Sequence, residues 1–404
     1  MTSSRKIAAY PFWALCTVGL FAILSSTMSK NPVLNPFARA LNTSDSLLGF
    51  VAAASTIPGI LISLPAGSLS DRFGRRKILV LSGVIFASAP FLYLFVTVWW
   101  HLIIVRFYHG FATAIFVPVA NAFVADMFPD KRGERISLFS SATTIGRTIA
   151  PFLGGYILFI TNYGFHELYL AVGIAGVTAF VTALLLLKEG TQTSSVIKDK
   201  SSAVGRWITV ASNPRIIVVS VVEAAQYYVF GAVEFFFIGY LIEVAKFDPF
   251  SFSVISGAQL VMIPLVKPFM GKLSDKIGRR TPIVAGTLIS AAALVAIPLT
   301  TLFALLLLVS ILYGIGFSLV SSSTPALVSE LSEQNLVGTS MGFLSMIMDV
   351  GQTLGPIITG FILAASLSYS FSFYSLSIIL LAACVVFAVT GITQNKKRDG
   401  SSRF

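Results

Sequence analysis

The sequence predicts an all-α membrane protein with twelve transmembrane helices in two pseudo-symmetric six-helix bundles. Hydrophobic residues make up 55% of the 404-residue chain and charged residues only 11%, whereas soluble domains carry roughly 25% charged residues. The apolar residues fall in runs of about 20 residues, the length that crosses a bilayer as a helix. A sequence phrase of the first half also returns in the second half, which predicts the two bundles.

Twelve apolar runs are long enough to span a membrane. In the first half they cover residues 8–29, 46–66, 78–98, 101–125, 136–160 and 167–187, and in the second half residues 216–241, 251–270, 282–300, 302–327, 338–363 and 371–393. The first run follows Arg5 and Lys6, as in a secretory signal peptide. No small-x-small cleavage site follows it and eleven similar runs come later, so we expect it to be the first transmembrane helix.

The basic residues predict the topology. Most of the 28 Lys and Arg residues lie in the N-terminal segment, in every second connection and in the C-terminal segment, whereas the remaining connections hold only Lys30, Arg39 and Lys246. Cytoplasmic connections of membrane proteins are enriched in Lys and Arg, so both termini are expected in the cytoplasm of a cell-membrane protein. The formal charge of +11 therefore reflects topology and does not indicate nucleic-acid binding.

The segment 188–215 is rich in Ser, Thr and Lys, which is typical of a linker. We expect it to join an N-terminal bundle, residues 1–187, to a C-terminal bundle, residues 216–404. It is too short for a soluble catalytic domain. Cys16 and Cys384 lie in apolar runs near opposite ends of the chain, so neither a disulfide nor a metal site is expected, and nothing indicates a cofactor.

The repeated phrase runs from Gly67 to Lys77 and recurs from Gly271 to Thr281. The fourth expected helix carries Gly110, and the tenth carries its copy Gly314 at the same offset. Further anchors recur with a slip of one residue: Gly146, Pro151 and Gly155 match Gly351, Pro356 and Gly360. The phrase resembles the signature between helices 2 and 3 of the major facilitator superfamily. The resemblance covers essentially the whole chain and implies a transporter with a central cavity between two bundles.

Within the phrase, Gly74 and Gly278 allow tight reversals between helices. Asp126 is expected to pair with Arg75 or Arg76 by charge-assisted hydrogen bonds. The resemblance implies a cytoplasmic gate whose bonds break when the cavity opens inward; alternatively, the arginines only set the topology. The gate candidates are Gly67, Asp71, Arg72, Gly74, Arg75, Arg76, Asp126, Asp275, Gly278 and Arg279.

Arg106 lies inside the fourth expected helix, and a charge within the membrane is costly and usually functional. The surrounding residues resemble the helix 4 motif of the family, with His109 where Gln is common. That motif is associated with proton transfer in proton-coupled members. The alternatives are a structurally paired or snorkelling arginine and a histidine that only packs.

The fifth expected helix contains Gly146, Pro151, Gly154 and Gly155. This pattern resembles the antiporter signature of the family, which marks exporters, although Ala150 replaces the usual Gly before the proline. Small residues let helices approach closely and proline bends a helix. Arg147 is unusual at its position and is a candidate for gating or substrate binding, or else for a structural ion pair.

Three carboxylates fall inside expected helices, namely Glu223, Glu234 and Asp349. Glu223 and Glu234 are about three helical turns apart and therefore share a face, with Tyr227 and Phe230 between them. This stripe suits a cationic or amphipathic substrate and a proton site. Glu234 is the stronger candidate, because Glu223 alternatively lies near the water interface.

Two further lysines lie near the ends of expected helices. Lys267, next to Pro268, is expected to snorkel to the membrane interface. Lys30 ends the first helix on the outer side, where it is placed to gate the mouth.

The favoured function is a secondary active transporter, a proton-coupled exporter of drugs or small amphipathic molecules, and a monomer in the lipid bilayer. The alternative is an importer or uniporter of a metabolite such as a sugar or organic anion, which Arg106 and Arg147 would hold. A third hypothesis is a non-transporting receptor on the same scaffold. The sequence has no Walker phosphate loop and no catalytic motif, so it does not predict an enzyme.

Overall fold

The computed structural model describes residues 3–128, 131–187, 203–333 and 336–391, and within these ranges the regular elements are helices with no strand. Twelve of them are long and apolar enough to cross a membrane, which confirms the predicted fold class. The first half contains α1 (Ser3–Met28), α2 (Leu34–Ala40), α3 (Asp45–Ala53), α4 (Ile57–Phe73), α5 (Arg75–Leu92), α6 (Trp99–Met127), α7 (Arg132–Ile160) and α8 (Phe165–Leu186). The second half contains α9 (Ala203–Ala211), α10 (Pro214–Glu243), α11 (Pro249–Ile277), α12 (Arg280–Ala296), α13 (Phe303–Leu331), α14 (Val337–Ser366) and α15 (Tyr369–Val389).

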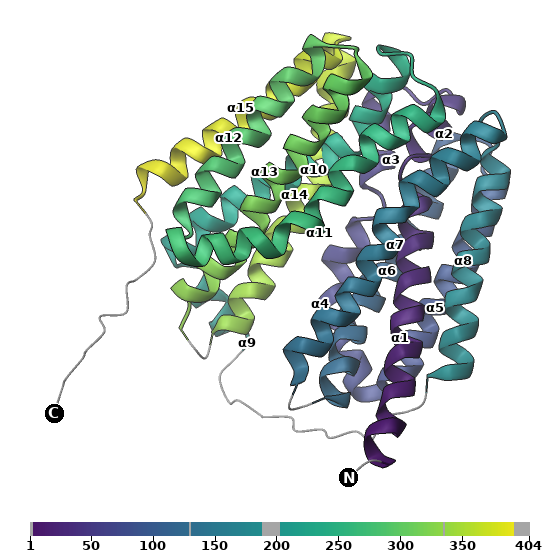
Figure 1. The fold of residues 1–404 in the computed structure, drawn as a ribbon, viewed down its shortest axis with the longest axis vertical. Helices are drawn as coiled ribbons and strands as arrows, with labels where there is room; N and C mark the ends of the chain where they lie inside the picture. The colour runs from purple at the N-terminus through teal and green to yellow at the C-terminus, as the bar shows by residue number, and fades with distance from the viewer. Residues whose placement is uncertain (1–2, 129–130, 188–202, 334–335, 392–404) are drawn as a thin grey trace.

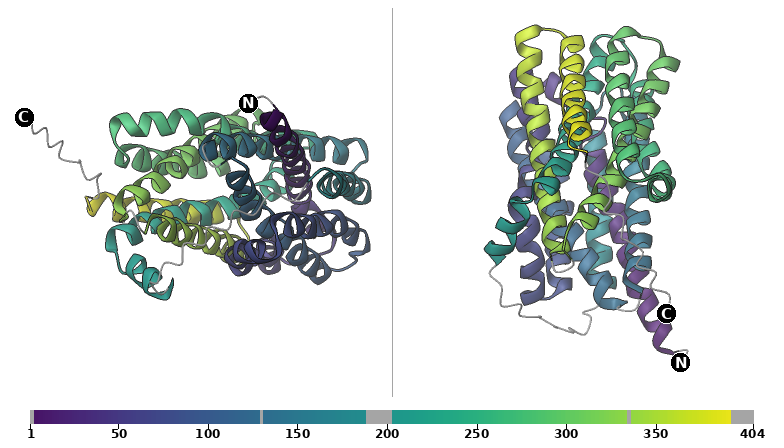
Figure 2. Two further views of the ribbon diagram at one scale, coloured as in Figure 1. Left: turned by 90° about the horizontal axis from the view of Figure 1, so that it is seen from below. Right: turned by 90° about the vertical axis from the view of Figure 1, so that its left-hand side faces the viewer.

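The helices form two bundles, one from each half of the chain (Figure 1). Helix α1 packs on α7 and α8 in the first bundle, and α10 packs on α14 and α15 in the second. The bundles meet through two equivalent pairs, α3 with α14 and α7 with α11. Figure 2 shows the purple-to-teal helices of the first half beside the green-to-yellow helices of the second. The sequence repeat is therefore also a repeat in space.

Local sequence explains where several helices begin and end. The side chains of Asn213 and Asp248 cap α10 and α11 by accepting backbone N–H bonds, and Pro follows each cap. Such caps are worth about 1 kcal/mol each. Gly74 and Gly278 have φ values of 98° and 87°, which confirms the tight reversals predicted there, because residues with a side chain rarely adopt this backbone conformation.

The second transmembrane span differs from its prediction as one continuous helix. It is broken after Ala53, and α4 begins at Ile57 with Pro58 in its first turn, where the missing N–H of proline does no harm. Two short helices, α2 and α9, were not predicted. Residues 188–202 of the expected linker lie outside the described residues, and residues 203–211 form α9.

We call the side that carries Gly74, Gly278 and α9 the linker face, and the side that carries α2 the opposite face. The ribbons of the two bundles diverge toward the linker face, where α1 begins (Figure 1). Near the opposite face the bundles touch closely: a Cβ added at Gly49 would lie 2.2 Å from the Pro356 carbonyl oxygen, and one at Gly155 would lie 2.1 Å from Ser253 Oγ. Among the described residues, these close contacts between the bundles lie near the opposite face.

Candidate functional site

An ion pair and a hydrogen bond join the bundles at the opposite face. Lys30, after α1, forms an ion pair with Glu234 of α10, and their side chains are 18% and 8% exposed. Nearby, the Asn35 side-chain amide donates to the backbone carbonyl of Phe235 at 3.2 Å. The structure thus places Lys30 at the mouth, as its sequence position predicted, and supplies its partner.

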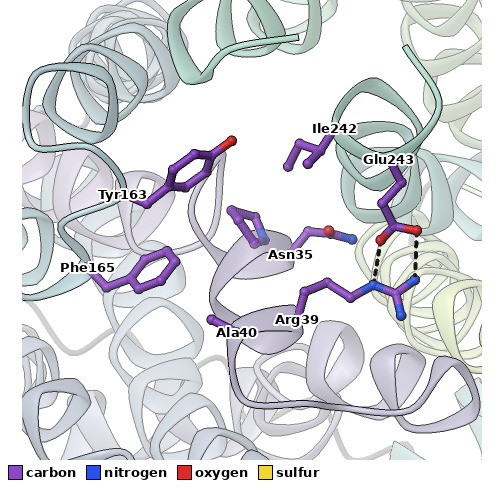
Figure 3. Close-up of a pocket in the computed structure, with 8 residues that line it drawn as sticks. Asn35, Arg39, Ala40, Tyr163, Phe165, Ile242 and Glu243 are labelled. Atoms are coloured by element: carbon purple, nitrogen blue, oxygen red, sulfur yellow. Dashed lines mark hydrogen bonds and ion pairs between the residues drawn. The ribbon is translucent and has the colours of Figure 1, made fainter. Parts of the chain in front are cut away.

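Arg39 of α2 forms a second connection between the bundles (Figure 3). Its guanidinium lies 2.7 Å from a carboxylate oxygen of Glu243 in α10 and 2.6 Å from one of Asp45 in its own bundle. It also donates to the Tyr369 hydroxyl at 3.2 Å. This network borders an outer cavity of about 450 Å³, lined by Asn35, Pro36, Arg39, Ala40, Tyr163, Phe165, Ile242 and Glu243. Sequence reasoning missed the network, since its residues lie far apart along the chain.

Closer to the linker face, α10 presents aromatic rings and a buried carboxylate. Phe317 of α13 packs against Tyr227 and Phe230, with ring centroids 5.3 and 4.7 Å apart. Glu223 is fully buried and accepts a hydrogen bond of 2.5 Å from Thr324. Burial rules out the interpretation that Glu223 lies at the water interface. Glu223 and Glu234 are separated by about 16 Å of helix, so the predicted stripe holds two separate carboxylate sites.

Three charged residues lie near the middle of their helices between the bundles: Arg147 of α7, Lys267 of α11 and Asp349 of α14. Arg147 and Lys267 are exposed and Asp349 is half-buried. Lys267 interacts electrostatically with Glu223 and Arg147. Lys267 thus has a charged neighbour in each bundle, and the expectation that it snorkels to the interface stays a prediction.

Asp349 lies where α14 meets α4. A Cβ added at Gly59 would lie 3.6 Å from Oδ2 of Asp349. One turn nearer the opposite face, the hydroxyls of Thr353 and Thr56 are 2.7 Å apart. Asp349 therefore stands at the edge of the contact between the bundles.

Arg106 is buried inside the first bundle, 2% exposed. Its guanidinium donates to the hydroxyl of Ser55 in the break between α3 and α4, and it forms no ion pair with any described carboxylate. His109 is 3% exposed, with Nδ1 at 3.4 Å from Ser29 Oγ and 3.5 Å from the Tyr93 hydroxyl. The burial of Arg106 does not fit a snorkelling side chain, whereas its hydrogen bond to Ser55 fits the alternative of a structurally paired arginine. A role of Arg106 in proton transfer stays a prediction.

The small residues of α7 contact two different neighbours. A Cβ at Gly146 would lie 2.3 Å from the Leu20 carbonyl oxygen of α1, within the bundle, and Gly154 faces Pro32. Pro151 and Gly155 instead contact α11, against Gly257 and Ser253. The predicted close approach thus occurs both within one bundle and between the two.

At the linker face the repeated phrase forms two matching clusters. Arg75 pairs with Asp71 at 2.5 Å and with Asp126 of α6 at 3.0 Å, which confirms the predicted Asp126 partner. In the second half, Arg279 pairs with Asp275 at 2.5 Å and with Glu330 of α13 at 2.8 Å. Glu330 was missed, although it is the repeat counterpart of Asp126.

The other arginines of the phrase donate to backbone carbonyls or lie against an aromatic ring. Arg76 donates to the Leu187 and Leu184 carbonyls, and Arg280 does the same to Ala388. Arg72 lies over the Phe73 ring, and Gly67 lies within α4. The Arg75 bonds are present although the bundles diverge toward this face. That these bonds break when this face opens stays a prediction.

Among the described residues no group of three metal-ligating side chains gathers. Cys16 and Cys384 are both buried and free.

Comparison with known proteins agrees with this architecture. The family model of the Major Facilitator Superfamily matches residues 15–266 and 227–403. An "uncharacterized MFS-type transporter" of Methanocaldococcus jannaschii is 25% identical, over 84% of this chain and 89% of that protein. "Multidrug resistance protein 2" of Bacillus subtilis is 25% identical, over 92% of each chain. "Quinolone resistance protein NorA" of Staphylococcus aureus is 22% identical, over 81% of this chain and 84% of that protein.

Solved structures share the fold. A bacterial homologue of the human lysosomal transporter Spinster, solved in an inward-facing and occupied conformation, superposes with a TM-score of 0.80 at 16% identity, over 94% of this chain and 96% of that one. The nucleoside transporter NupG gives a TM-score of 0.75 at 14% identity, over 94% and 98%. Together with the twelve membrane-spanning helices and their internal repeat, these matches identify this chain as a member of the Major Facilitator Superfamily, a multi-pass membrane transporter.

Proposed function

We propose that this chain exports drugs or other small amphipathic molecules in exchange for protons by alternating access. The observation that carries the proposal is the asymmetry of the two faces: ionisable side chains join the bundles at the opposite face, while the bundles diverge toward the linker face. Several relatives are named for resistance to drugs, among them the proteins of Bacillus subtilis and Staphylococcus aureus. The antiporter-like residues of α7 at the bundle contact also favour export.

The orientation follows from charge. Because Lys and Arg gather at the linker face, that face is cytoplasmic and both termini lie in the cytoplasm. The structure then corresponds to an inward-facing state, and substrate enters from the cytoplasm between the bundles. Family members are commonly monomers, and we propose the same here.

Coupling is assigned to Glu234. A proton that reaches Glu234 from outside neutralises the carboxylate, removes its attraction for Lys30 and weakens the seal between the bundles. Outward opening then releases the substrate, and the proton moves inward in the return step, in which Glu234 passes the proton on and re-forms its pair with Lys30. Glu223 and Asp349, which lie nearer the linker face than Glu234, are the further proton-site candidates. Arg106 and His109 form a buried polar group inside the first bundle.

The test is transport in proteoliposomes with an imposed pH gradient and a panel of amphipathic fluorescent probes. An antiporter accumulates substrate when the lumen is more acidic than the bath, whereas a symporter accumulates it when the lumen is more alkaline. Glu234→Gln is expected to retain probe binding and to lose the dependence on the gradient. Accumulation driven only by an alkaline lumen would favour the importer, and binding without any transport would favour the receptor.

A further inference from the structure

Two basic side chains in membrane spans, Arg147 and Lys267, lie on helices of different bundles that pack against each other. Arg147 lies at the middle of α7 and Lys267 in the inner part of α11, and both are exposed although they lie inside membrane spans. Neither forms an ion pair with a described carboxylate. Lys267 interacts electrostatically with the buried Glu223, but a charge at this depth without an ion pair is costly, so an anionic ligand beside Arg147 would be bound favourably.

The placement of Arg147 follows from the contact between α7 and α11. Pro151 packs against Gly257, and this contact lies in the half of each helix nearer the opposite face. Arg147 is one turn below Pro151 toward the linker face and therefore points to the same side of α7. It lies just where the two bundles begin to separate.

Lys267 approaches the same place from the other bundle. It comes after Gly257 along α11 and so lies on the linker-face side of the contact with α7. It interacts electrostatically with Arg147, so the two cations stand on opposite sides of one region. The Tyr227 ring interacts electrostatically with Arg147 and Asp349, which places α10 and α14 beside them.

The carboxylates of this region are less available to a ligand than the cations. Glu223 is fully buried and bonded to Thr324, and Asp349 is half-buried against α4. The accessible groups are thus a guanidinium and an ammonium, together with the partly exposed rings of Tyr227 and Phe230. The carboxylates alone had suggested a cationic substrate; the arrangement of side chains favours the opposite charge.

We propose that the transported substrate is an amphipathic organic anion whose carboxylate, sulfonate or phosphate group lies between Arg147 and Lys267. Its apolar body packs on the rings of Tyr227 and Phe230, which are partly exposed. The planar guanidinium can donate two parallel hydrogen bonds to such a group, and Lys267 adds a second charge from the other bundle. This inference rests on the proposed function, because it names the substrate of that transport path.

The test compares two probes that share one fluorophore and differ in charge. Dansylglycine carries a carboxylate and dansylcadaverine an ammonium group, and the dansyl emission reports binding to an apolar site. Wild-type protein in nanodiscs is expected to bind dansylglycine at least about tenfold more tightly than dansylcadaverine, a difference of about 1.4 kcal/mol. Arg147→Gln and Lys267→Gln should each abolish this preference.

Lys272→Gln is the matched control, because Lys272 is an exposed lysine on the same helix nearer the linker face; it should bind both probes as the wild type does. Arg147→Lys retains the charge and should retain the preference for the anion. Tighter binding of dansylcadaverine to the wild type, or unchanged dansylglycine binding in both Gln variants, would overturn the inference.

Equilibrium binding needs no proton gradient, so this test is independent of the transport test. If the anion preference depends on Arg147 and Lys267 but neither probe is transported, the site assignment stands and the proposed export is wrong. If a gradient drives transport of the cationic probe and the anion does not bind, export stands and the substrate class is wrong.

Discussion

Lys30 and Glu234 form an ion pair that joins the two bundles at the opposite face. Glu234 is 8% and Lys30 18% exposed, so removal of either partner leaves the other charge poorly solvated. The pair lies in the part of the structure that must separate for the opposite face to open. Its energy therefore contributes directly to the balance between the two conformations.

Glu234→Gln is expected to shift the population toward the state that is open at the opposite face. Loss of a partly exposed pair is worth about 1 kcal/mol, or roughly a fivefold change in the ratio of states. Spin labels at Ser44→Cys and Thr301→Cys, one on each bundle at that face, report the opening as longer distances. Labels at Lys77→Cys and Lys276→Cys report shorter distances at the linker face.

The matched variants for this test are Lys30→Gln and the double variant Lys30→Gln/Glu234→Gln. If the pair is the cause, the two single substitutions have non-additive effects on the distance distribution. Additive shifts, or no shift in Glu234→Gln, would contradict a sealing role for this pair.

Gly155→Ala is expected to force the bundles apart at the opposite face. The new Cβ would lie 2.1 Å from Ser253 Oγ and 2.2 Å from Ser253 Cβ, far inside van der Waals contact, and the conflict lies between bundles. The same labels should therefore report opening without a large loss of thermal stability. Ser253→Gly removes both atoms, so Gly155→Ala/Ser253→Gly should return toward the wild-type distances; failure of this rescue would place the strain elsewhere.

Gly146→Ala is expected to create a clash within one bundle, because its Cβ would lie 2.3 Å from the Leu20 carbonyl oxygen. The helical backbone of α1 cannot move aside as easily as a serine side chain. We expect this variant to lower the unfolding temperature clearly, with no second substitution that restores it. Unchanged stability, measured by thermal unfolding in detergent, would show that α1 and α7 can move apart freely.

The sequence predicted the helices and the linker-face clusters better than the contacts at the opposite face. Apolar runs determine spans because the bilayer imposes their length, and the repeat placed Gly74, Gly278 and the Arg75–Asp126 pair correctly. The partner of Lys30 could not be predicted, since it depends on how two bundles dock. For the same reason the sequence did not predict the Arg39–Glu243 pair or the residues around Lys267. The break after Ala53 was not predicted, although Pro58 in the first turn of α4 is a local signal for the start of a helix.

Arg75→Gln and Arg279→Gln are expected to destabilise different bundles. Each arginine joins helices of its own bundle at the linker face, and an exposed pair of this kind is worth about 1 kcal/mol. Cys16 and Cys384 are buried, one in each bundle, so a thiol-reactive dye can report each bundle in turn. With Cys384→Ala present, Arg75→Gln should expose Cys16 at a temperature lower by roughly 1–3 °C.

Arg279→Gln should lower the temperature at which Cys384 becomes exposed, measured in a Cys16→Ala background. Its effect on Cys16 should be smaller than that of Arg75→Gln. If either substitution lowers both exposure temperatures equally, the bundles unfold as one unit and the pairs do not act locally.

Arg106→Gln is expected to separate stability from transport. Arg106 is 2% exposed and forms no ion pair with a described carboxylate, so the folded protein bears the cost of burying its charge. Glutamine keeps a donor for Ser55 and removes that cost. The unfolding temperature should therefore stay the same or rise. Gradient-driven transport in proteoliposomes should fall by at least about tenfold, because a costly buried charge without an ion pair is usually functional. A variant that is destabilised but transports normally would show instead that the guanidinium only holds α6 against the break in the second span.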